Sequence, residues 1–582
     1  MRRLRGAAAS PGIASGPSVR LVVAPRPAGR RIAPAEAPGE LERFHAAVTV
    51  TSEALEELAT RVSVDGHPDE GAIFRAQAAM ARDPALADLV ETQIRHGGDA
   101  IAGLGAAAAD LAGQLRGLGD ELLSARAADV EDVAGRMTDV IAGSGPPPTL
   151  DRPSIVVADD LPPSLTASLP RERLLGIALE TGSPTAHAAI LARAYGIPAV
   201  VGIAGLLATL DSAPGEEVQI IIDGDAGEVV LDPDETTAAW LRERTSAAAL
   251  AADRALAEAT LEAITRDGVE VTLLANIGTP AESERAVALG AKGVGLFRTE
   301  FLFIERSTPP TEAEQVRAYR SVVEAFAPHT VTIRLLDVGG DKPIPYLPIP
   351  PEANPFLGVR ALRLAPDRPD LFVTQLRAAM RAAAPRDDGP LGPLGPVKVM
   401  APMIADATDT DVLLALAGRA RTELDQEGVP HGPVMLGVML EIPSAILVGD
   451  SYFGRLGFAS LGTNDLLQYT IAVDRGNSQL ARYQDSLHPA VLRLVHEAVE
   501  RAGRAGIELS VCGEMAGDPP AALALVGLGI RQLSMAAPSL AAVRRAIRGS
   551  DHATLEREAL AALDQPSAGA VRERFVALLP AG

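Results

Sequence analysis

The sequence has little cysteine, fewer basic than acidic side chains and no long apolar run. Its 582 residues include one cysteine, Cys512, which excludes an internal disulfide framework and suits a reducing compartment. Lysine and arginine number 53 against 75 aspartate and glutamate residues, giving a net charge of −22. This charge argues against a nucleic acid or an anionic membrane as partner, whereas it permits a basic protein partner.

Membrane insertion is not expected, because no segment approaches the ~18 consecutive apolar residues of a transmembrane helix. The first ten residues combine early arginines with small side chains, as signal peptides do. Ser10-Pro-Gly12 interrupts them before an apolar region can form. The sequence therefore predicts a soluble cytoplasmic protein, and its length suggests three or four domains.

Among only nine histidines, His187 lies where a loop passes into a helix. Residues 182–184 favour a loop, Thr185 is a suitable N-cap, residues 188–195 favour a helix, and Gly196-Ile-Pro198 ends it. Backbone N–H groups and the positive end of the helix dipole favour an anion there. An imidazole at this position suits a phosphoryl acceptor, and a histidine with a purely structural role is the alternative.

The second half of the chain contains eight short apolar strand candidates separated by helical stretches. These candidates end at Asn276, Arg298, Asp337, Met403, Glu441, Asn464, Gly513 and Ser534. Eight strand–helix units predict a (β/α)₈ barrel, whose reactive groups lie at the carboxyl ends of its strands. A doubly wound sheet is the alternative.

Three arginines, Arg298, Arg334 and Arg360, occur at or soon after successive strand ends. Guanidinium groups that converge on one cavity repel each other unless they meet an anion, and their geometry suits carboxylate and phosphate. Each arginine taken alone also suits a surface ion pair. The set therefore predicts an anion site.

Two acidic residues, Glu441 and Asp465, follow neighbouring strand candidates. Their carboxylates would provide the hard oxygen ligands that Mg²⁺ prefers, with water and substrate oxygens completing its coordination. The alternative is a buried acid paired with an arginine. Cys512 ends a strand on the same rim, although a lone cysteine is usually a small core residue.

The first half of the chain differs in texture along its length. Residues 35–142 favour helices throughout, and we expect four or more of them. Strand-like segments occur on both sides, at residues 18–24, 154–158, 174–179, 218–223 and 228–231. The simplest organisation is one α/β domain with a helical domain inserted. Residues 234–266 predict a long connecting helix closed by Asp267-Gly268, or else an ordinary packed helix.

The motifs along the whole chain resemble those of the Enzyme I family, the phosphoenolpyruvate-dependent phosphotransferases of bacterial sugar uptake. The segment from Thr181 to Gly202 is similar to the family's phosphohistidine motif, with Ser183 and Ala186 in place of the usual glycine and serine. The barrel half contains Gly-Leu-Phe-Arg-Thr-Glu-Phe-Leu-Phe, Asp-Val-Gly-Gly-Asp-Lys, Asn-Pro-Phe-Leu-Gly, Gly-Thr-Asn-Asp-Leu-x-Gln-Tyr and Cys-Gly-Glu. These resemble the family's phosphoenolpyruvate-binding barrel, with Ile442 where threonine is common.

The resemblance implies a multidomain α/β protein. Residues 1–25 and 145–231 would form the phosphohistidine α/β domain, and residues 26–144 an inserted helical domain that binds the carrier. Residues 232–267 would form a linker helix. Residues 268–582 would form a C-terminal (β/α)₈ TIM barrel that binds phosphoenolpyruvate and pairs in a homodimer.

The resemblance also implies roles for individual residues. Phosphoenolpyruvate would be held by Arg298, Arg334, Arg360, Asn464, Asp465 and Arg475. Glu441 and Asp465 would hold Mg²⁺, and Cys512 would protonate the enolate. Supporting positions are matched by Thr166, Thr185, Arg193 and Lys342, of which Thr166 would hydrogen-bond the histidine. In the helical domain, residues 72–77 and 125–132 match the carrier-binding region.

The implied activity is a two-step relay that starts sugar uptake. His187 would take the phosphoryl group of phosphoenolpyruvate, pyruvate would leave, and the group would pass to a histidine of the small carrier protein HPr. Because His187 and the barrel lie in different domains, the α/β domain would have to swing, with residues 234–266 as the hinge.

Three other functions are alternatives to this relay. Pyruvate phosphate dikinase and phosphoenolpyruvate synthase need a nucleotide-binding domain, but no glycine-rich phosphate loop precedes His187. A nitrogen-regulatory relative would carry an N-terminal sensory domain. A non-catalytic regulator would not need the complete set of His187, Arg298, Arg334, Glu441, Asp465 and Cys512.

Overall fold

The computed structural model describes most of the chain in two compact units, Met1–Ala248 and Ala249–Gly582. The described residues are 2–21, 27–64, 68–117, 121–143, 150–161, 163–182, 187–212, 218–237, 239, 253–304, 306, 308–339, 344, 346–347, 349–350, 352–385, 394–474 and 478–580. Three expected site residues, Thr185, Lys342 and Arg475, lie outside this part, and so does the side chain of His187.

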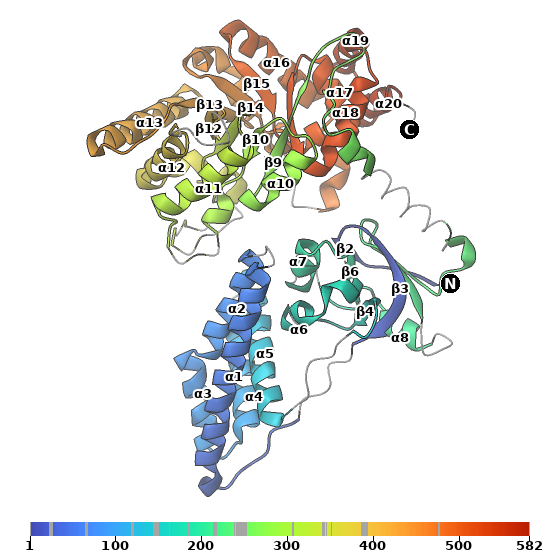
Figure 1. Ribbon diagram of the computed structural model, residues 1–582, viewed down its shortest axis with the longest axis vertical. Coiled ribbons are helices and arrows are strands. Elements are labelled where there is room, and N and C mark those ends of the chain that lie inside the picture. Colours follow the sequence, from blue (N-terminus) through green and yellow to red (C-terminus); the bar gives the residue numbers. More distant parts are fainter. Residues whose placement is uncertain are drawn as a thin grey trace. The chain divides into compact units, whose positions relative to one another are not determined.

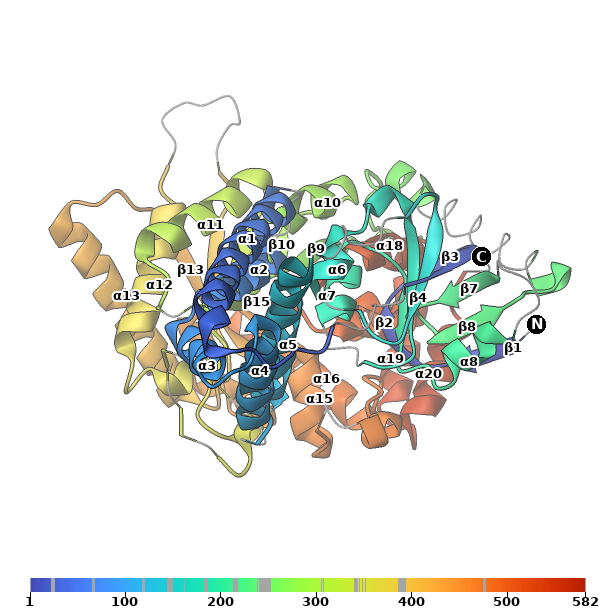
Figure 2. The same ribbon diagram turned by 90° about the horizontal axis from the view of Figure 1, so that it is seen from below.

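A mixed sheet of eight strands lies in the first unit, in the order β1-β8-β7-β3-β4-β5-β6-β2 (Figures 1 and 2). The strands are β1 (Arg2–Arg5), β2 (Ala7–Ser10), β3 (Ile13–Arg20), β4 (Ser154–Ala158), β5 (Leu174–Leu179), β6 (Ala199–Val201), β7 (Gln219–Asp223) and β8 (Glu228–Leu231). Successive residues of β4 belong to different cores, since Ile155 and Val157 pack in one and Val156 and Ala158 in the other. Both faces of the sheet are therefore covered.

Most strands of this sheet lie where the apolar segments predict them. The strand expected at residues 18–24 begins earlier, at Ile13, because β3 pairs with β7 through residues 13–17 and then with β4 through residues 18–20. Strands β1 and β2 were not predicted. They are short and rich in arginine or alanine, without alternating apolar residues, and they form at the two edges of the sheet by pairing with β8 and β6.

Five α-helices lie between β3 and β4 in the described residues, which confirms the all-helical insertion (Figure 1). They are α1 (Ala37–Val64), α2 (Pro68–Ala81), α3 (Pro84–Arg95), α4 (Ala100–Gly117) and α5 (Glu121–Ala142). Their common core contains fully buried apolar side chains, among them Leu55, Phe74, Leu104 and Met137. Two short helices of the α/β part, α6 (Pro163–Ser168) and α8 (Leu206–Asp211), follow later in the chain.

The second unit contains a closed barrel of eight parallel strands. They are β9 (Thr272–Ile277), β10 (Val294–Phe297), β11 (Val331–Arg334), β12 (Val397–Ala401), β13 (Val434–Leu440), β14 (Phe458–Leu461), β15 (Glu508–Val511) and β16 (Gln532–Ala536). Pairing of β16 with β9, from Gln532↔Thr272 to Ala536↔Asn276, closes the barrel and rules out the doubly wound alternative. The expected ends at Asp337 and Asn464 lie beyond their strands, whereas Ser534 lies within β16.

At least one helix follows each barrel strand. The helices are α10 (Ser283–Ala288), α11 (Glu312–Ala325), α12 (Pro369–Ala382), α13 (Ala407–Glu427), α14 (Pro443–Leu447), α15 (Thr463–Ile471), α16 (Pro489–Ala505), α17 (Pro519–Gly527), α18 (Leu540–Arg548), α19 (His552–Ala562) and α20 (Ala568–Val576). None of the helices in the described part of the chain combines the length and the apolar character needed to cross a membrane.

The long helix expected over residues 234–266 is wrong at its C-terminal end. Among the described residues of this segment, the last helical residue is residue 257. Beyond it, barrel residues engage the backbone: Arg548 donates to the Glu262 carbonyl at 2.8 Å, and the Arg266 N–H donates to the Ser550 carbonyl at 2.9 Å. These contacts replace the helical hydrogen bonds that the sequence pattern predicts.

Candidate active site

Helix α7 (His187–Ala194) begins at His187, close to the helix start that the sequence predicts. Gly196 follows it with φ 66°, in the left-handed region where glycine commonly ends a helix. Residues 183–186 lie outside the described part, so the cap expected from Thr185 stays a prediction.

Helix α7 is fixed on two sides. Ala188, Ala189 and Ala192 are buried in the core on one face of the sheet, whereas Leu191 is buried in the core of the helical bundle. Arg193 adds a polar anchor, because its Nε and Nη2 donate to the carbonyl of Ala9 in β2 at 3.1 and 2.8 Å. Arg193 therefore holds the helix that carries His187 against the sheet.

The other expected site residues of this unit lie on helices α6, α2 and α5. Thr166 is buried on α6, which packs against α7. Gln77 and Asp129 belong to the segments that match a carrier-binding region. Both are buried, and Gln77 Nε2 donates to Asp129 Oδ1 at 2.9 Å. These two side chains join α2 to α5 and are not on the surface that a carrier would touch.

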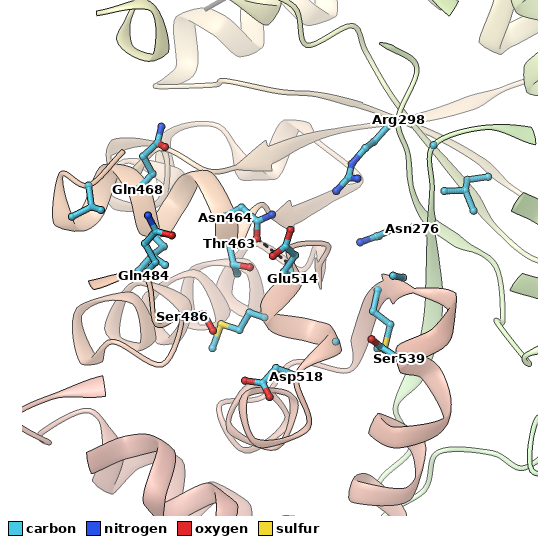
Figure 3. Close-up of a pocket in the computed structure, with 18 of the residues that line it drawn as sticks. Asn276, Arg298, Thr463, Asn464, Gln468, Gln484, Ser486, Glu514, Asp518 and Ser539 are labelled. Carbon is cyan, nitrogen blue, oxygen red and sulfur yellow. Dashed lines mark hydrogen bonds between the residues drawn. The ribbon is translucent and has the colours of Figure 1, made fainter. Parts of the chain in front are cut away.

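A cavity of about 940 Å³ opens at the carboxyl end of the barrel strands (Figure 3). Its polar lining includes Asn276, Glu282, Arg298, Thr463, Asn464, Gln468, Gln484, Ser486, Glu514 and Asp518. In Figure 3 the side chains of Arg298, Asn276 and Asn464 point toward the same space. This volume suits a small organic substrate.

Arg298 and Asn464 present N–H donors to this cavity. Arg298 follows β10 directly, and its side chain is exposed. Asn464 lies in the first turn of α15, and its Oδ1 accepts the backbone N–H of Glu514 at 2.9 Å. Because this bond fixes the oxygen side of the amide, the nitrogen side remains available as a donor. Both residues therefore suit an oxyanion.

Arg334 and Arg360 do not line the cavity; they lie in a buried ion-pair network near it. Arg334 contacts Glu300 at 3.0 Å and Asp337 at 3.3 Å. Arg360 Nη2 donates to both carboxylate oxygens of Asp337 at 2.9 Å, and its Nη1 lies 3.6 Å from Asp465 Oδ1. Carboxylates thus balance two of the three arginines expected to meet an anion.

Glu300 and Asp337 complete this buried network, although the sequence pattern assigns them no role. Both are buried, and the Asp337 N–H donates to Glu300 Oε1 at 2.9 Å. The sequence could have indicated one of these ion pairs, since Arg334 and Asp337 are three residues apart. Thr299 supports the same corner, because its hydroxyl donates to the Arg334 carbonyl at 3.0 Å.

Glu441 and Asp465 lie beside this network with an excess of negative charge. Glu441 is buried at the end of β13 and accepts the backbone N–H of Met403 at 2.6 Å. Burial, together with the charges of Asp337 and Asp465, raises the pKa of Glu441 to about 8, although Arg334 and the Met403 N–H oppose this shift. A divalent cation would offset such a charge excess.

Two buried carboxylates, Glu441 and Asp465, offer hard oxygen donors of the kind that a divalent cation takes. The described residues contain no group of three or more histidine, cysteine, aspartate or glutamate side chains that could hold a metal. Mg²⁺ commonly needs only one or two carboxylates, with water and substrate oxygens as the other ligands. Glu441 and Asp465 meet that requirement.

Cys512 follows β15 directly and is buried in the barrel interior beside Leu296, Met400 and Met439. Its Sγ lies 3.6 Å from the Leu461 carbonyl, and the cysteine is not among the residues that line the cavity. Burial raises the pKa of this thiol to about 11, with a smaller contribution from Glu441. The thiol therefore keeps its proton at neutral pH.

The thiol of the native protein is expected to react slowly with a disulfide reagent such as dithionitrobenzoate. With a pKa of about 11, roughly one thiol in a thousand is ionised at pH 8. An unfolded thiol ionises near pH 8.5. The folded state thus binds more protons between about pH 8.5 and 11, and the free energy of unfolding falls as pH rises through this range.

This reactivity is measured by absorbance at pH 8, with urea-unfolded protein as the control for one reactive thiol per chain. Cys512→Ser removes the signal from both samples. Fast, complete reaction of the native protein at pH 8 would contradict the buried, protonated thiol.

Three domain models of one enzyme family match successive parts of the chain. Residues 5–126, 150–227 and 252–552 match the N-terminal, mobile and PEP-binding domains of PEP-utilising enzymes. The chain therefore belongs to the family of PEP-utilising enzymes. A relative from Streptomyces coelicolor, a phosphoenolpyruvate-protein phosphotransferase, is 41% identical over 99% of both chains. One of the same name from Bacillus sp. (strain S) is 38% identical, covering 94% of this chain and 93% of its own.

Within that family the chain groups with the phosphoenolpyruvate-protein phosphotransferases, as the resemblance predicted. A multiphosphoryl transfer protein of Rhodobacter capsulatus is 42% identical over 87% of this chain, which spans 60% of that longer relative. An NMR solution structure of Enzyme I is 31% identical and covers 42% of this chain and 98% of its own, with a TM-score of 0.35.

Proposed function

We propose that this protein transfers the phosphoryl group of phosphoenolpyruvate to its own His187, releasing pyruvate, and then to a histidine of the carrier protein HPr. The observation that carries the proposal is the set of groups gathered at one end of the barrel. N–H donors of Arg298 and Asn464 face the cavity, and two carboxylates and a protonated thiol lie buried nearby. A reaction that turns an anionic substrate into an enolate uses N–H donors to bind the anion, carboxylates to hold a cation and an acid to protonate the enolate.

Arg298 and Asn464 bind the carboxylate or phosphate of the substrate through N–H···O bonds. Arg334 and Arg360 belong to this proposal as substrate ligands through the family resemblance, and Glu300 and Asp337 hold their orientation. Arg475 and Lys342 belong to this proposal through the family resemblance alone. Glu441 and Asp465 would hold Mg²⁺, which spreads the charge of the transferring phosphoryl group when bound.

The first transfer exchanges a P–O bond of the substrate for a P–N bond to the protein. The imidazole of His187 forms a P–N bond while the bond from phosphorus to the bridging oxygen breaks, and that oxygen keeps the electron pair as an enolate. The S–H of Cys512 then gives its proton to the methylene carbon, which forms the new C–H bond of pyruvate. The sulfur keeps its electron pair as a thiolate and takes a proton from water before the next turnover.

The phosphorylated His187 gains from its place at the start of α7, because free backbone N–H groups and the helix dipole favour an anion there. Thr166 and Thr185 are the proposed supporting hydroxyls. HPr as acceptor, a homodimer formed through the barrels, and a cytoplasmic location rest on the family resemblance.

The proposal is tested by the release of pyruvate, coupled to lactate dehydrogenase. Without HPr, the protein with Mg²⁺ and excess phosphoenolpyruvate is expected to release about one pyruvate per chain in a burst and then stop. HPr converts this burst into continuous turnover. His187→Ala removes the burst. Release of pyruvate by His187→Ala at the normal rate would overturn the assignment.

Gly513 follows Cys512 in the chain, and Gly513→Ala is expected to displace the cysteine. A Cβ at Gly513 would lie 1.9 Å from Thr463 Oγ1 and 2.6 Å from the Thr463 backbone nitrogen, so the loop must move away from α15. Such overpacking costs about 1–3 kcal/mol, and we expect a lower Tm together with at least about tenfold slower pyruvate release.

The matched control for this glycine is Gly503→Ala in helix α16, where an added Cβ meets nothing within 4 Å. Alanine is favourable inside a helix, so this variant is expected to keep or slightly raise the Tm and to leave pyruvate release unchanged. Equal behaviour of the two variants in both measurements would contradict the close approach of Gly513 to α15.

A further inference from the structure

Asn276 links Cys512 to the first strand of the barrel. Asn276 has no role in the reaction proposed above. It lies near the carboxyl end of β9 and lines the cavity (Figure 3). Its Nδ2 donates to the backbone carbonyl of Cys512 at 2.9 Å. Its Oδ1 accepts the hydroxyl of Ser534, a fully buried residue of β16, at 2.6 Å.

The carbonyl of Cys512 fixes which way the Asn276 amide faces. The carbonyl of Cys512 can only accept a hydrogen bond, so the amide nitrogen must face it. With the nitrogen facing that carbonyl, the Ser534 hydroxyl donates to the amide oxygen and holds the oriented amide in place. Gly295 in β10 leaves room for this serine, since a Cβ there would lie 2.5 Å from Ser534 Oγ.

Cys512 is held differently on its two sides. Toward β14, its backbone N–H donates to the Leu461 carbonyl at 3.0 Å, and the next residues contact the start of α15. Toward β16, the register of β15 contains a single pair, Val511↔Leu533, which lies before the cysteine. The side-chain amide of Asn276 thus supplies, beyond the end of this short ladder, a link from Cys512 to the β9 and β16 side.

We propose that Asn276, locked by Ser534, is a positioning residue that sets the face on which Cys512 delivers its proton to the enolate. The proposal rests on the proposed function, in which the Cys512 S–H is the proton donor. Asn276 acts through the Cys512 backbone, and the electron pair of the broken S–H bond stays on the sulfur as before. Removing the amide leaves the thiol present but lets the residue shift.

The test follows the stereochemistry of protonation, which a purely structural residue would not change. The probe is the Z isomer of 3-fluorophosphoenolpyruvate, turned over in D₂O with Mg²⁺ and HPr. The product, 3-fluoro-3-deuteriopyruvate, is reduced at once by lactate dehydrogenase and analysed by ¹⁹F NMR. A donor fixed on one face of the enolate gives one configuration, whereas a misplaced donor or free enolate gives both.

Asn276→Ala and Ser534→Ala are expected to give mixed configurations and about 10- to 100-fold slower turnover, with Asn276→Ala the more affected. Ser534→Ala provides the answer if Asn276→Ala does not fold. The matched control is Ser550→Ala, which removes another buried hydroxyl, bonded to the Ala546 carbonyl at 2.8 Å, from the end of α18. It is expected to keep the single configuration.

The two proposals fail in different ways. If Cys512→Ala keeps both the rate and the single configuration, Cys512 is not the acid and the proposed function loses that step. If Cys512→Ala loses them while folded Asn276→Ala and Ser534→Ala both retain the wild-type rate and configuration, the positioning role of Asn276 alone is overturned.

Discussion

Arg298→Met is expected to lower kcat/KM for phosphoenolpyruvate by about 10²- to 10³-fold without changing the Tm. Arg298 follows β10, is exposed and lines the cavity, and no hydrogen bond or ion pair of its side chain occurs among the described contacts. We therefore expect its guanidinium group to act in binding the substrate anion.

Steady-state pyruvate release and thermal unfolding measure the two halves of this expectation. Arg298→Lys keeps the charge but loses the planar fork, so it should retain an intermediate activity. Arg306→Met is the matched control, because Arg306 lies in the same connection but pairs with Glu314 at 2.7 Å. Wild-type kcat/KM in Arg298→Met would contradict its role at the cavity.

Glu441→Gln is expected to abolish most activity while stabilising the protein in the absence of divalent cations. The variant loses a proposed Mg²⁺ ligand, and pyruvate release should fall by more than about 100-fold. At the same time it removes a carboxyl group that must take up a proton on folding above about pH 4, because burial and the charges of Asp337 and Asp465 disfavour its ionised form. The two effects have opposite signs, which separates a ligand from a merely stabilising residue.

The pH dependence gives the sign of the stability effect. Glu441 has a pKa of about 8 in the folded protein and about 4.3 when unfolded, so the folded state keeps its proton over this range. The free energy of unfolding of the wild type should then fall between about pH 4 and 8, and Glu441→Gln should remove that part of the decline. Urea unfolding at pH 5 and pH 9 in EDTA measures it. Wild-type Mg²⁺ dependence of activity in the variant would contradict the ligand assignment.

The barrel was predictable because each of its strands carries a local signal, a short apolar run that ends near a polar residue. Helix α7 was predictable for the same reason, since its start and stop residues lie beside it in the sequence. Strands β1 and β2 carry no such signal, because they form through pairing at the sheet edges. The C-terminal end of the expected linker helix was lost to hydrogen bonds with distant barrel residues.

The arrangement of the site depends on which strands become neighbours, and composition does not show this. Asp337 pairs with Arg360 across a loop, and the pair forms only when the chain after β11 folds back onto the barrel. The contact of Asn276 with Ser534 requires the first and last barrel strands to be adjacent. The sequence places Asn276 and Ser534 near strand ends, but only the closed barrel shows that they are partners.

The central claim is that His187 carries the phosphoryl group, and mass spectrometry of the protein after incubation with phosphoenolpyruvate and Mg²⁺ tests it most directly. The account predicts the mass gain of one phosphoryl group per chain, located by alkaline-stable peptide mapping on the peptide that contains His187, and lost in acid. A chain that gains no phosphoryl group, or gains it on another residue while His187 stays unmodified, would contradict the account.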